Sequence, residues 1–376
     1  MPGNMLPAWL TLSFVPGLGC TRIHRLVEVF GSPAAVLAAP AQALRQVEGI
    51  GPKVSQVLAD PAAMETAGRQ AELELRRLGD RNLVLLCPDD PRYPSLLRSI
   101  ADPPALLYCQ GDLHRLTLPA VAIVGSRAAT AYGRRISFEL ARELASRGIC
   151  VVSGMALGID SQAHAGALAG GGATIGVLGC GADVVYPPQH GAMFGEVRGR
   201  GLLLTEYPLG SKPEGFRFPE RNRIISGLSL GVVVVEASLK SGSLITAALA
   251  LEQGREVFAV PGRIDSVKSQ GAHRLLQQGA KLVHSVDDIL EELSLAGRFA
   301  AGSRDDLPGP PPVPMTEAEQ RLWNCLDVYP LTVDQLVQQS GFEPAQVLSL
   351  LLDMELKGLV RQLPGQEYER RAAGSR

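Results

Sequence analysis

The amino-acid sequence predicts an α/β protein with a doubly wound, mostly parallel sheet, a helical domain before the sheet and a winged helix after it. Three observations lead to this prediction. Between residues 83 and 298, short apolar runs bounded by glycine alternate with helical segments, which is the pattern of parallel strands joined by helical crossovers. Residues 1–82 show short helical periodicities broken by Gly and Pro. Residues 315–376 show three helical segments before a short β-like end.

Composition narrows the class of protein and of its partners. The 376 residues are 46% apolar, which is enough for a sizeable core, and the net charge of −2 hides an uneven distribution. Residues 115–275 hold 17 Lys and Arg against 12 Asp and Glu, whereas residues 301–376 hold 7 against 11. An anionic partner is therefore expected at the middle of the chain.

Cysteines and apolar runs indicate the compartment. The six cysteines are scattered with no Cys-x-x-Cys pair, and several lie in strand-like runs, which favours buried free thiols in a reducing environment. The N-terminus lacks a basic leader, and no apolar run approaches the roughly 20 residues of a membrane span. We expect a cytoplasmic protein without a membrane partner.

In residues 1–82, two Gly-containing turns lead into helices: VPGLGCTRIHRLVEVFG (15–31) and VEGIGPKVSQVLA (47–59). Glycine allows each turn to tighten, and the free N–H groups at the helix start can hold a phosphate. Both turns resemble helix-hairpin-helix motifs, the second more closely, with Lys53 just beyond the turn. The same turns also suit plain connections between packed helices, so both interpretations stay open.

The central segment is expected to alternate strands and helices. The strands are expected at 82–87, 105–109, 120–125, 149–154, 174–179, 202–206, 231–237, 256–260 and 281–283. The helices include 131–147, 158–169, 218–226, 243–253 and 270–278. Ligands of such a sheet bind beyond the carboxyl ends of its strands.

Three Gly/Ser loops fall at that edge of the sheet and predict phosphate binding. They are Gly125-Ser126-Arg127, Ser153-Gly154 with Asp160 near the next helix start, and Lys240-Ser241-Gly242-Ser243. Each offers unpaired backbone N–H groups and hydroxyl donors, and two carry a cation, which together suit a phosphate. No P-loop motif occurs and no G-x-G-x-x-G follows a strand, so ATP hydrolysis of the P-loop type is not supported.

The stretch FRFPERNRI (216–224) concentrates rings and guanidinium groups in a chain that is poor in aromatic residues. Pro219 suits a first helical turn, which places Phe218 at the mouth of a helix on the same edge of the sheet. A base stacked on a ring contributes about 1–3 kcal/mol and arginines hold the backbone, so single-stranded nucleic acid is the expected ligand. The candidate binding residues here are Phe216, Arg217, Phe218, Arg221, Asn222 and Arg223. For Asn222 and Arg223, an inward-facing role in organising neighbouring loops stays open.

Candidates for catalysis are few. Asp160 and His164 lie four residues apart on one helix face, but a third metal ligand at matching spacing is absent. Ser126 and Ser153 lack a base nearby in the sequence. We therefore predict no metal, no cofactor and no enzymatic activity.

Residues 299–314 are rich in Pro and Gly and predict a linker. The three helical segments and β-like end that follow predict a winged helix. Because residues 301–376 are acidic in balance, we expect a protein-docking or regulatory role for this domain in preference to strong DNA binding.

Residues 105–285 contain blocks that resemble the DprA (Smf) family of DNA-processing proteins. In order, the blocks are VAIVGSR, VVSGMALGID, GVLGCGADVVYP, TEYPLGSKPEGFRFPERNRIISGLS, VVVVEASLKSGSLITAALALEQGREVFAVPG and GAHRLLQQGAKLV. The resemblance implies a Rossmann-like central domain, a helical domain of the sterile-alpha-motif-like, helix-hairpin-helix kind before it, and a winged helix after it. The family's DNA pocket maps onto Gly125, Ser126 and Arg127, onto the FPERNR block and onto KSGS at 240–243.

The same resemblance implies partners. It implies a homodimer that binds single-stranded DNA and protects incoming DNA during natural transformation. It also implies that the recombinase RecA is loaded onto that DNA in the presence of single-strand-binding protein.

The rival interpretation is an enzyme. Nucleotide phosphoribohydrolases of the lysine-decarboxylase-like group share this type of sheet and use a P-G-G-x-G-T-x-x-E block, whose glutamate attacks the sugar. The corresponding loop here reads KSGSLITA, with Ala247 where the glutamate would be expected. The sequence therefore favours DNA binding over nucleotide cleavage.

Overall fold

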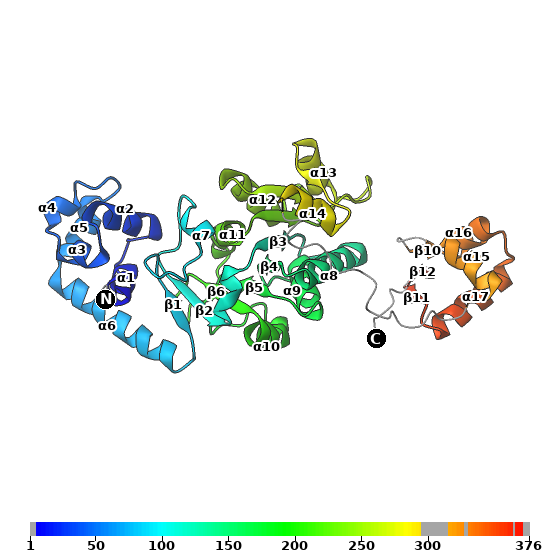
Figure 1. Cartoon of the computed structure of the whole chain (residues 1–376), viewed down its shortest axis with the longest axis horizontal. Helices are drawn as coiled ribbons and strands as arrows, with labels where there is room; N and C mark the ends of the chain where they lie inside the picture. Colours follow the sequence, from blue (N-terminus) through cyan, green and yellow to red (C-terminus); the bar gives the residue numbers. More distant parts are fainter. Residues whose placement is uncertain (1–4, 295–314, 327–329, 364, 371–376) are drawn as a thin grey trace. The chain divides into compact units, whose positions relative to one another are not determined.

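The computed structural model describes residues 5–294, 315–326, 330–363 and 365–370 (Figure 1). The chain forms two compact units, residues 1–300 and residues 301–376, and each is described by itself. The predicted linker at 299–314 lies outside the described residues.

Between residues 5 and 79 the first unit consists of six helices. They are α1 (Leu6–Ser13), α2 (Cys20–Phe30), α3 (Pro33–Ala38), α4 (Ala41–Leu44), α5 (Pro52–Ala59) and α6 (Pro61–Gly79). The two Gly-containing turns precede α2 and α5. Trp9 and Leu26 of these helices share one buried core with Leu85 and Tyr108 of the first two strands. Helices and sheet therefore form one continuous unit, and the predicted domain boundary between residues 82 and 83 stays a prediction.

The sheet of the first unit has nine strands among the described residues, in the order β1-β2-β6-β5-β4-β3-β7-β8-β9. β1 (Val84–Leu86) and β2 (Leu107–Gly111) pair in antiparallel fashion. The parallel strands are β3 (Ala120–Val124), β4 (Cys150–Ser153), β5 (Thr174–Val177), β6 (Leu202–Thr205), β7 (Gly231–Val234), β8 (Glu256–Ala259) and β9 (Lys281–Leu282). The chain moves outward from β3 to β6 and then returns to β7 on the other side of β3. The strand order thus reverses between β3 and β7, and ligands of open α/β sheets bind at such a reversal.

Side chains of the central strands alternate between two cores. In β3, Ala122 and Val124 pack on the face covered by α11 (Arg217–Gly227) and α12 (Gly242–Glu252). Ile123 packs on the opposite face, which is covered by α8 (Ala131–Ser146) and α9 (Ile159–Ala169). All of β3 is buried because helices cover both faces, which explains its uninterrupted apolar sequence.

The remaining helical elements of the first unit lie around this framework. They are α7 (Ser95–Arg98), η1 (Leu113–Thr117), η2 (Pro188–His190), α10 (Gly191–Arg200), α13 (Gln270–Gln277) and α14 (Val286–Glu292). Every strand and helix predicted for the central segment is confirmed. The pattern does not predict α10, because Gly191, Gly195 and Gly199 interrupt it and its buried residues are Phe194 and Val197. None of the described helices is both long and apolar enough to cross a bilayer.

The second unit is a winged helix, as predicted. Its helices are α15 (Glu317–Cys325), α16 (Val333–Ser340) and α17 (Pro344–Leu356), and β10 (Leu331–Thr332), β12 (Glu367–Arg370) and β11 (Val360–Leu363) form its sheet in that order. Capping boxes start α15 at Thr316 and α16 at Thr332, which fixes where these helices begin. Leu322, Leu336 and Leu351 lie in its separate core.

Candidate functional site

An open groove lies where the strand order of the sheet reverses. It has a volume of about 520 Å³. Five segments line it: the loop after β3, the loop that leads into α9 with the start of that helix, Tyr186 of the loop after β5, residues 213–225, and the start of α12. Gly125 and Arg127 come from the first of these segments, and Ser241, Gly242 and Ser243 come from the last. Parts of the chain that are distant in sequence therefore meet at one site.

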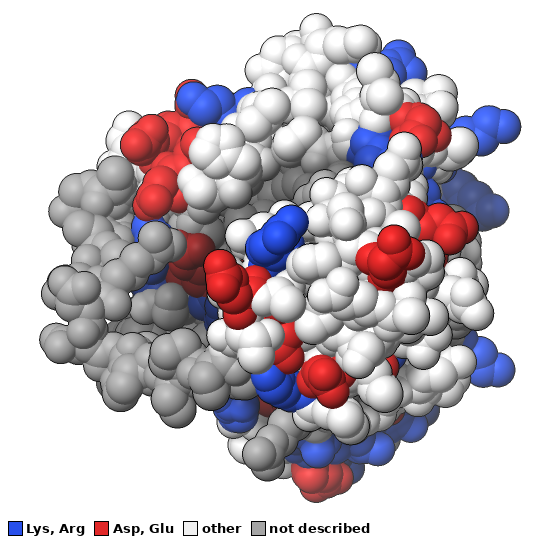
Figure 2. Space-filling model, turned by 90° about the vertical axis from the view of Figure 1, so that its right-hand side faces the viewer, with Lys and Arg blue, Asp and Glu red and all other residues white. Residues whose placement is uncertain are grey.

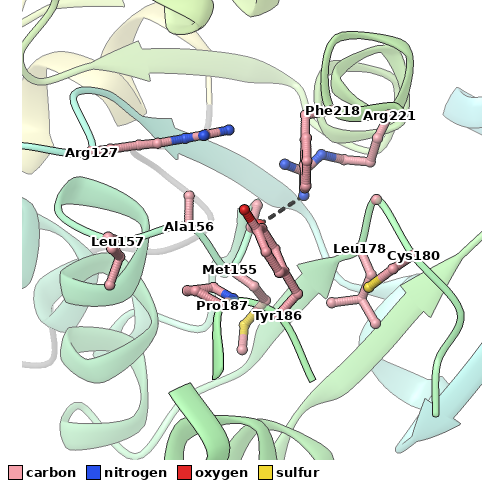
Figure 3. Close-up of a pocket in the computed structure, with 12 residues that line it drawn as sticks. Arg127, Met155, Ala156, Leu157, Leu178, Cys180, Tyr186, Pro187, Phe218 and Arg221 are labelled. Atoms are coloured by element: carbon pink, nitrogen blue, oxygen red, sulfur yellow. Dashed lines mark hydrogen bonds between the residues drawn. The ribbon is translucent and has the colours of Figure 1, made fainter. Parts of the chain in front are cut away.

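An arginine and two rings form one wall of the groove (Figure 3). The guanidinium carbon of Arg127 lies 5.3 Å from the centre of the Phe218 ring. The centres of the Phe218 and Tyr186 rings are also 5.3 Å apart. Arg127 is exposed, and its guanidinium makes no hydrogen bond to another described residue. A cation over an aromatic face is held by the ring's quadrupole, so the arginine is oriented while its N–H donors stay available.

A smaller cavity of about 50 Å³ adjoins this wall. It shares Arg127, Tyr186 and Phe218 with the groove, and Met155 and Leu178 contribute apolar surface (Figure 3). The rings thus have charged surroundings on the groove side and apolar surroundings behind them.

Arg221 supports the groove from within the protein. Its side chain is 4% exposed, and Nη1 donates to the carbonyl oxygens of Gly154, at 2.8 Å, and of Val177. Oδ2 of the buried Asp160 accepts from the N–H groups of Gly154 at 3.2 Å and Ala156 at 3.4 Å. Burial lowers the pKa of Arg221 to about 10, against the attraction of Asp160, so the guanidinium remains charged at neutral pH. Arg221 therefore orders the loop after β4 and adds positive potential beneath the groove.

The helix starts around the groove differ in their freedom to bind an anion. At α8, the Glu236 carboxylate accepts from the backbone N–H of Thr130 at 2.9 Å and from its hydroxyl. At α9, the Asp160 carboxylate accepts hydrogen bonds from two backbone N–H groups of the preceding loop. α12 begins at exposed Gly242, whose N–H has no hydrogen-bond partner within the described part of the chain. The expectation of free N–H groups thus holds for Gly242 at α12. It is corrected at the loop after β4, where an internal carboxylate accepts from them, and at Ser126 after β3, whose N–H donates to the carbonyl of Glu236 at 2.8 Å.

Two of the candidate residues that do not line the groove are buried by other contacts. Ser153 is fully buried, and its Oγ donates to the carbonyl oxygen of Ile123 at 2.7 Å. Arg223 is buried and forms ion pairs with Glu206 at 2.5 Å and with Asp102 at 3.0 Å. The inward-facing role left open for Arg223 is therefore the one observed, whereas Ser153 is buried under the loop and cannot contact a ligand.

Phe216 and Phe218 have different surroundings. Residues two apart at a helix start point to different sides. Phe216 is 58% exposed, and the Arg217 guanidinium lies between its ring and that of Tyr207, at 5.7 and 4.9 Å from the two ring centres. Neither Phe216 nor Arg217 lines the groove, whereas Asn222, one helical turn after Phe218, does. The Asn222 side chain also donates to the carbonyl of the first residue of α12, at 3.4 Å.

Further cations lie near the groove without lining it. Lys240 is exposed beside Ser241. Lys268, from the loop after β8, donates from Nζ to the carbonyl of Ala128 next to Arg127. On the face drawn in Figure 2, basic and acidic side chains are interspersed and neither forms a continuous patch. Among the lining residues of the groove, Arg127 and Arg221 are basic and Asp160 is acidic.

Two residues near the groove were missed by sequence reasoning. Tyr186 could have been predicted from the sequence, because it is an aromatic residue in the loop after a predicted strand, at the same edge of the sheet. Lys268 could not, because no Gly/Ser pattern marks its loop and its position depends on the fold of α8 and β8.

The structure also locates the residues considered for catalysis. No three His, Cys, Asp or Glu side chains within the described ranges are placed to hold a metal ion. His164 is fully buried with Nδ1 2.7 Å from the Thr174 hydroxyl, and burial lowers its pKa to about 3. Ala247, which replaces the expected catalytic glutamate, is completely buried in the core beneath α12.

Fold and site together define a Rossmann-like α/β protein with a cationic, ring-lined groove at the strand-order reversal, followed by a winged helix. The chain belongs to the family of DNA recombination-mediator protein A. The model of that family matches residues 84–294, and the model of the DprA winged helix domain matches residues 307–366.

Known relatives match from about half of the chain to nearly all of it. Protein Smf of Synechocystis sp. is 36% identical over 398 residues, which span 96% of this chain and 98% of that protein. The DNA processing protein DprA of Bacillus subtilis is 47% identical over 203 residues, which span 54% of this chain and 68% of that protein.

Solved structures agree with the fold. The crystal structure of DNA processing protein A from Streptococcus pneumoniae superposes with a TM-score of 0.65 at 37% identity, over 75% of this chain and 95% of that one. The structure of DNA processing protein A from Helicobacter pylori, described for its single-stranded DNA binding mode, has a TM-score of 0.52 at 35% identity. It covers 56% of this chain and 95% of that one.

Proposed function

We propose that this protein binds single-stranded DNA in the groove at the β3–β7 reversal and acts as a recombination mediator in natural transformation. In this role it protects incoming DNA and loads RecA onto it. The observation that most supports this proposal is that the Arg127 guanidinium lies over the Phe218 ring, at 5.3 Å, in the wall of an open groove. Membership of the recombination-mediator family and the DNA-binding relative from Helicobacter pylori support the proposal.

The chemistry of the groove suits an unpaired strand. A base that stacks on Phe218 or Tyr186 gains about 1–3 kcal/mol without regard to sequence. Arg127 and the N–H of Gly242, which both line the groove, offer donors to phosphate oxygens. Arg221 also lines the groove but is only 4% exposed, and its charge adds attraction.

Single strands are favoured over duplex and over free nucleotides for separate reasons. In a duplex the base faces are stacked on one another, so rings in a groove wall cannot reach them. A mononucleotide brings a single base and so cannot use both rings of the groove at once, whereas a strand can.

The proposed partners follow from the family. They are RecA, single-strand-binding protein and a second copy of the chain, in the cytoplasm and without a membrane partner. The chain itself is proposed to act without a cofactor and without catalysis.

A binding titration tests the proposed ligand. Fluorescence anisotropy of the full chain is measured with a labelled single strand, the matching duplex and a mononucleotide, at several salt concentrations. We expect tight binding of the single strand, weaker binding of duplex and little binding of the nucleotide, with an affinity that falls as salt rises. Equal affinity for duplex and single strand, or preference for the nucleotide, would contradict the proposal.

RecA loading is tested on DNA that is already coated. RecA-dependent ATP hydrolysis is measured on single strands covered by single-strand-binding protein, with and without this protein. We expect faster onset in its presence, and no acceleration with an Arg127→Ala/Phe218→Ala variant. Acceleration that survives in this variant would separate loading from the groove.

A further inference from the structure

The third helix of the winged helix exposes a stripe of leucines. In α17, Leu348, Leu352 and Leu356 are 49%, 58% and 80% exposed, and their spacing of four residues places them on one helix face. Val347 and Leu351 on the other face are completely buried in the core of the domain. The orientation of α17 is thus fixed by one apolar face, and a second apolar face is left uncovered.

This helix lacks the side chains that a nucleic acid requires. In DNA-binding winged helices and helix-turn-helix domains, the recognition helix enters the major groove with polar and basic residues. Residues 344–356 include no Lys or Arg, and they include Asp353 and Glu355. An apolar, acidic helix would repel the phosphate backbone.

Cations elsewhere in the domain are largely engaged. The Arg321 guanidinium lies 4.9 Å from the Phe342 ring centre, and Lys357 pairs with Glu319 at 2.7 Å. Arg370 donates to a backbone carbonyl at 2.7 Å and stacks on an indole ring. Within the described part of the domain, Arg361 is the one cation with no such contact, and Arg321 keeps its N–H donors available over the ring. The domain therefore has little free positive charge to offset its acidic residues.

Charge also disfavours a second copy of the chain as the occupant. An antiparallel pair of α17 helices centred on Leu352 would bring Asp353 and Glu355 close to the same residues of the other copy. Like charges in such a contact are unfavourable. A partner whose apolar stripe is flanked by Lys or Arg would instead complement both the leucines and the carboxylates.

We propose that α17 is a docking surface for a helical segment of a partner protein, one that carries an apolar stripe flanked by basic residues. When one helix docks against another, apolar side chains spaced three and four residues apart make the contact, and the leucines of α17 have this spacing. The surface lies in the second unit and shares no residue with the groove, so the winged helix would add a protein contact to the proposed function.

Two synthetic peptides serve as probes. Each is an amphipathic helix of about 18 residues, long enough to hold helical structure, with leucines spaced as in α17. In one peptide lysines flank the leucines, and in the other glutamates take those positions. Fluorescence anisotropy measures the binding of each to the full chain.

Matched variants locate the contact. Leu352→Asp places a charge in the stripe, and Leu251→Asp on α12 does the same at a residue that is 61% exposed, compared with 58% for Leu352. We expect wild type and Leu251→Asp to bind the lysine peptide equally, and Leu352→Asp to bind it at least about tenfold more weakly. The glutamate peptide should bind wild type at least about tenfold more weakly than the lysine peptide. If Leu352→Asp does not melt like wild type, Leu348→Ser takes its place.

Several outcomes would overturn the proposal. These are absence of lysine-peptide binding to wild type, and equal binding by wild type and the stripe variant. Sedimentation that shows a dimer lost on Leu352→Asp would assign the surface to a second copy. A loss of duplex DNA binding in that variant would assign it to nucleic acid.

Discussion

Arg127 and Phe218 come from different crossover connections of the sheet, and the guanidinium carbon of Arg127 lies 5.3 Å from the centre of the Phe218 ring. Both line the groove at the reversal of strand order. The contact joins a charge that can bind phosphate to a ring that can stack on a base, so the two halves of a nucleotide can be bound side by side. Removal of either residue should therefore affect binding in a distinguishable way.

Arg127→Ala should weaken single-strand binding and reduce its dependence on salt. Each phosphate contact to a single strand contributes about 0.7 to the slope of log K against log salt, so the slope should fall by about that amount. Lys240→Ala, beside Ser241, should act in the same direction, and Arg69→Ala on α6 is the control, because Arg69 is exposed and does not line the groove. An unchanged slope in Arg127→Ala would show that this residue does not contact the backbone.

Phe218→Ala should lower affinity by about 1–3 kcal/mol and leave the salt slope nearly intact, because stacking releases no counterions. Phe216→Ala removes an exposed ring that lies outside the groove and should have a smaller effect. Titrations at a single salt concentration compare the two variants. Equal losses would mean that the strand also crosses the Phe216 surface.

Gly154→Ala should destabilise the protein and disturb the groove. A Cβ at this position would lie 2.7 Å from Arg221 Nη2 and 2.7 Å from Asp160 Oδ2. Displacing such a buried pair costs about 1–3 kcal/mol. Gly242→Ala is the matched control, because its added Cβ meets nothing within 4 Å. Urea unfolding of both variants checks the difference, and equal stability would contradict the role of Arg221 as a support.

Arg223 should matter for stability more than for DNA affinity. Its side chain is 8% exposed and pairs with Glu206, which is 14% exposed. Arg223→Met leaves the Glu206 carboxylate buried without a partner, which should cost about 3 kcal/mol. The double variant Arg223→Met/Glu206→Gln should recover part of that loss, as measured by urea unfolding. If the single variant unfolds like wild type but binds DNA poorly, Arg223 contacts the ligand directly.

Acid should destabilise the fold partly through His164. Burial lowers its pKa to about 3, whereas the unfolded residue has an ordinary value near 6.5. Between pH 6.5 and pH 3, His164 is therefore protonated in the unfolded state and neutral in the folded state. The free energy of unfolding consequently falls as the pH drops below about 6.5. At pH 5 the loss from this group is about 2 kcal/mol. His164→Asn should show a shallower decline between pH 7 and pH 5 in urea unfolding, and an identical decline would exclude this histidine.

Much of the architecture could be predicted because its signals are local. The apolar runs of β3 and β7 and the glycines that bound them mark buried parallel strands directly in the sequence. The winged helix was predictable for the same reason, from three periodic segments and a short hairpin. α10 was not predicted. Three of its residues are glycines and its buried side chains are two in number, so its apolar periodicity is too weak to indicate a helix.

The site was predictable in its location and less so in its details. Gly/Ser loops after parallel strands meet at one edge by topology, so Arg127 and Ser241 were expected near one another. The use of each donor depended on distant residues. The Glu236 carboxylate accepts from a backbone N–H at the start of α8, and the Asp160 carboxylate accepts from one in the loop before α9. These N–H groups are therefore not available to a ligand. No local pattern states which carboxylate reaches which amide.

The sequence by itself determined the order of strands and helices along the chain, the edge of the sheet where the candidate binding residues meet, and the residue types gathered there, because periodicity, glycine turns and charge are properties of short segments. Only the tertiary structure decided which arginine faces outward. Arg127 lies over a ring in the groove wall, Arg221 is buried beneath it, and Arg223 is paired with carboxylates away from it. The physical reason is that burial of a charge depends on the carbonyls and carboxylates that distant segments bring to it, and these are set only when the whole chain has folded.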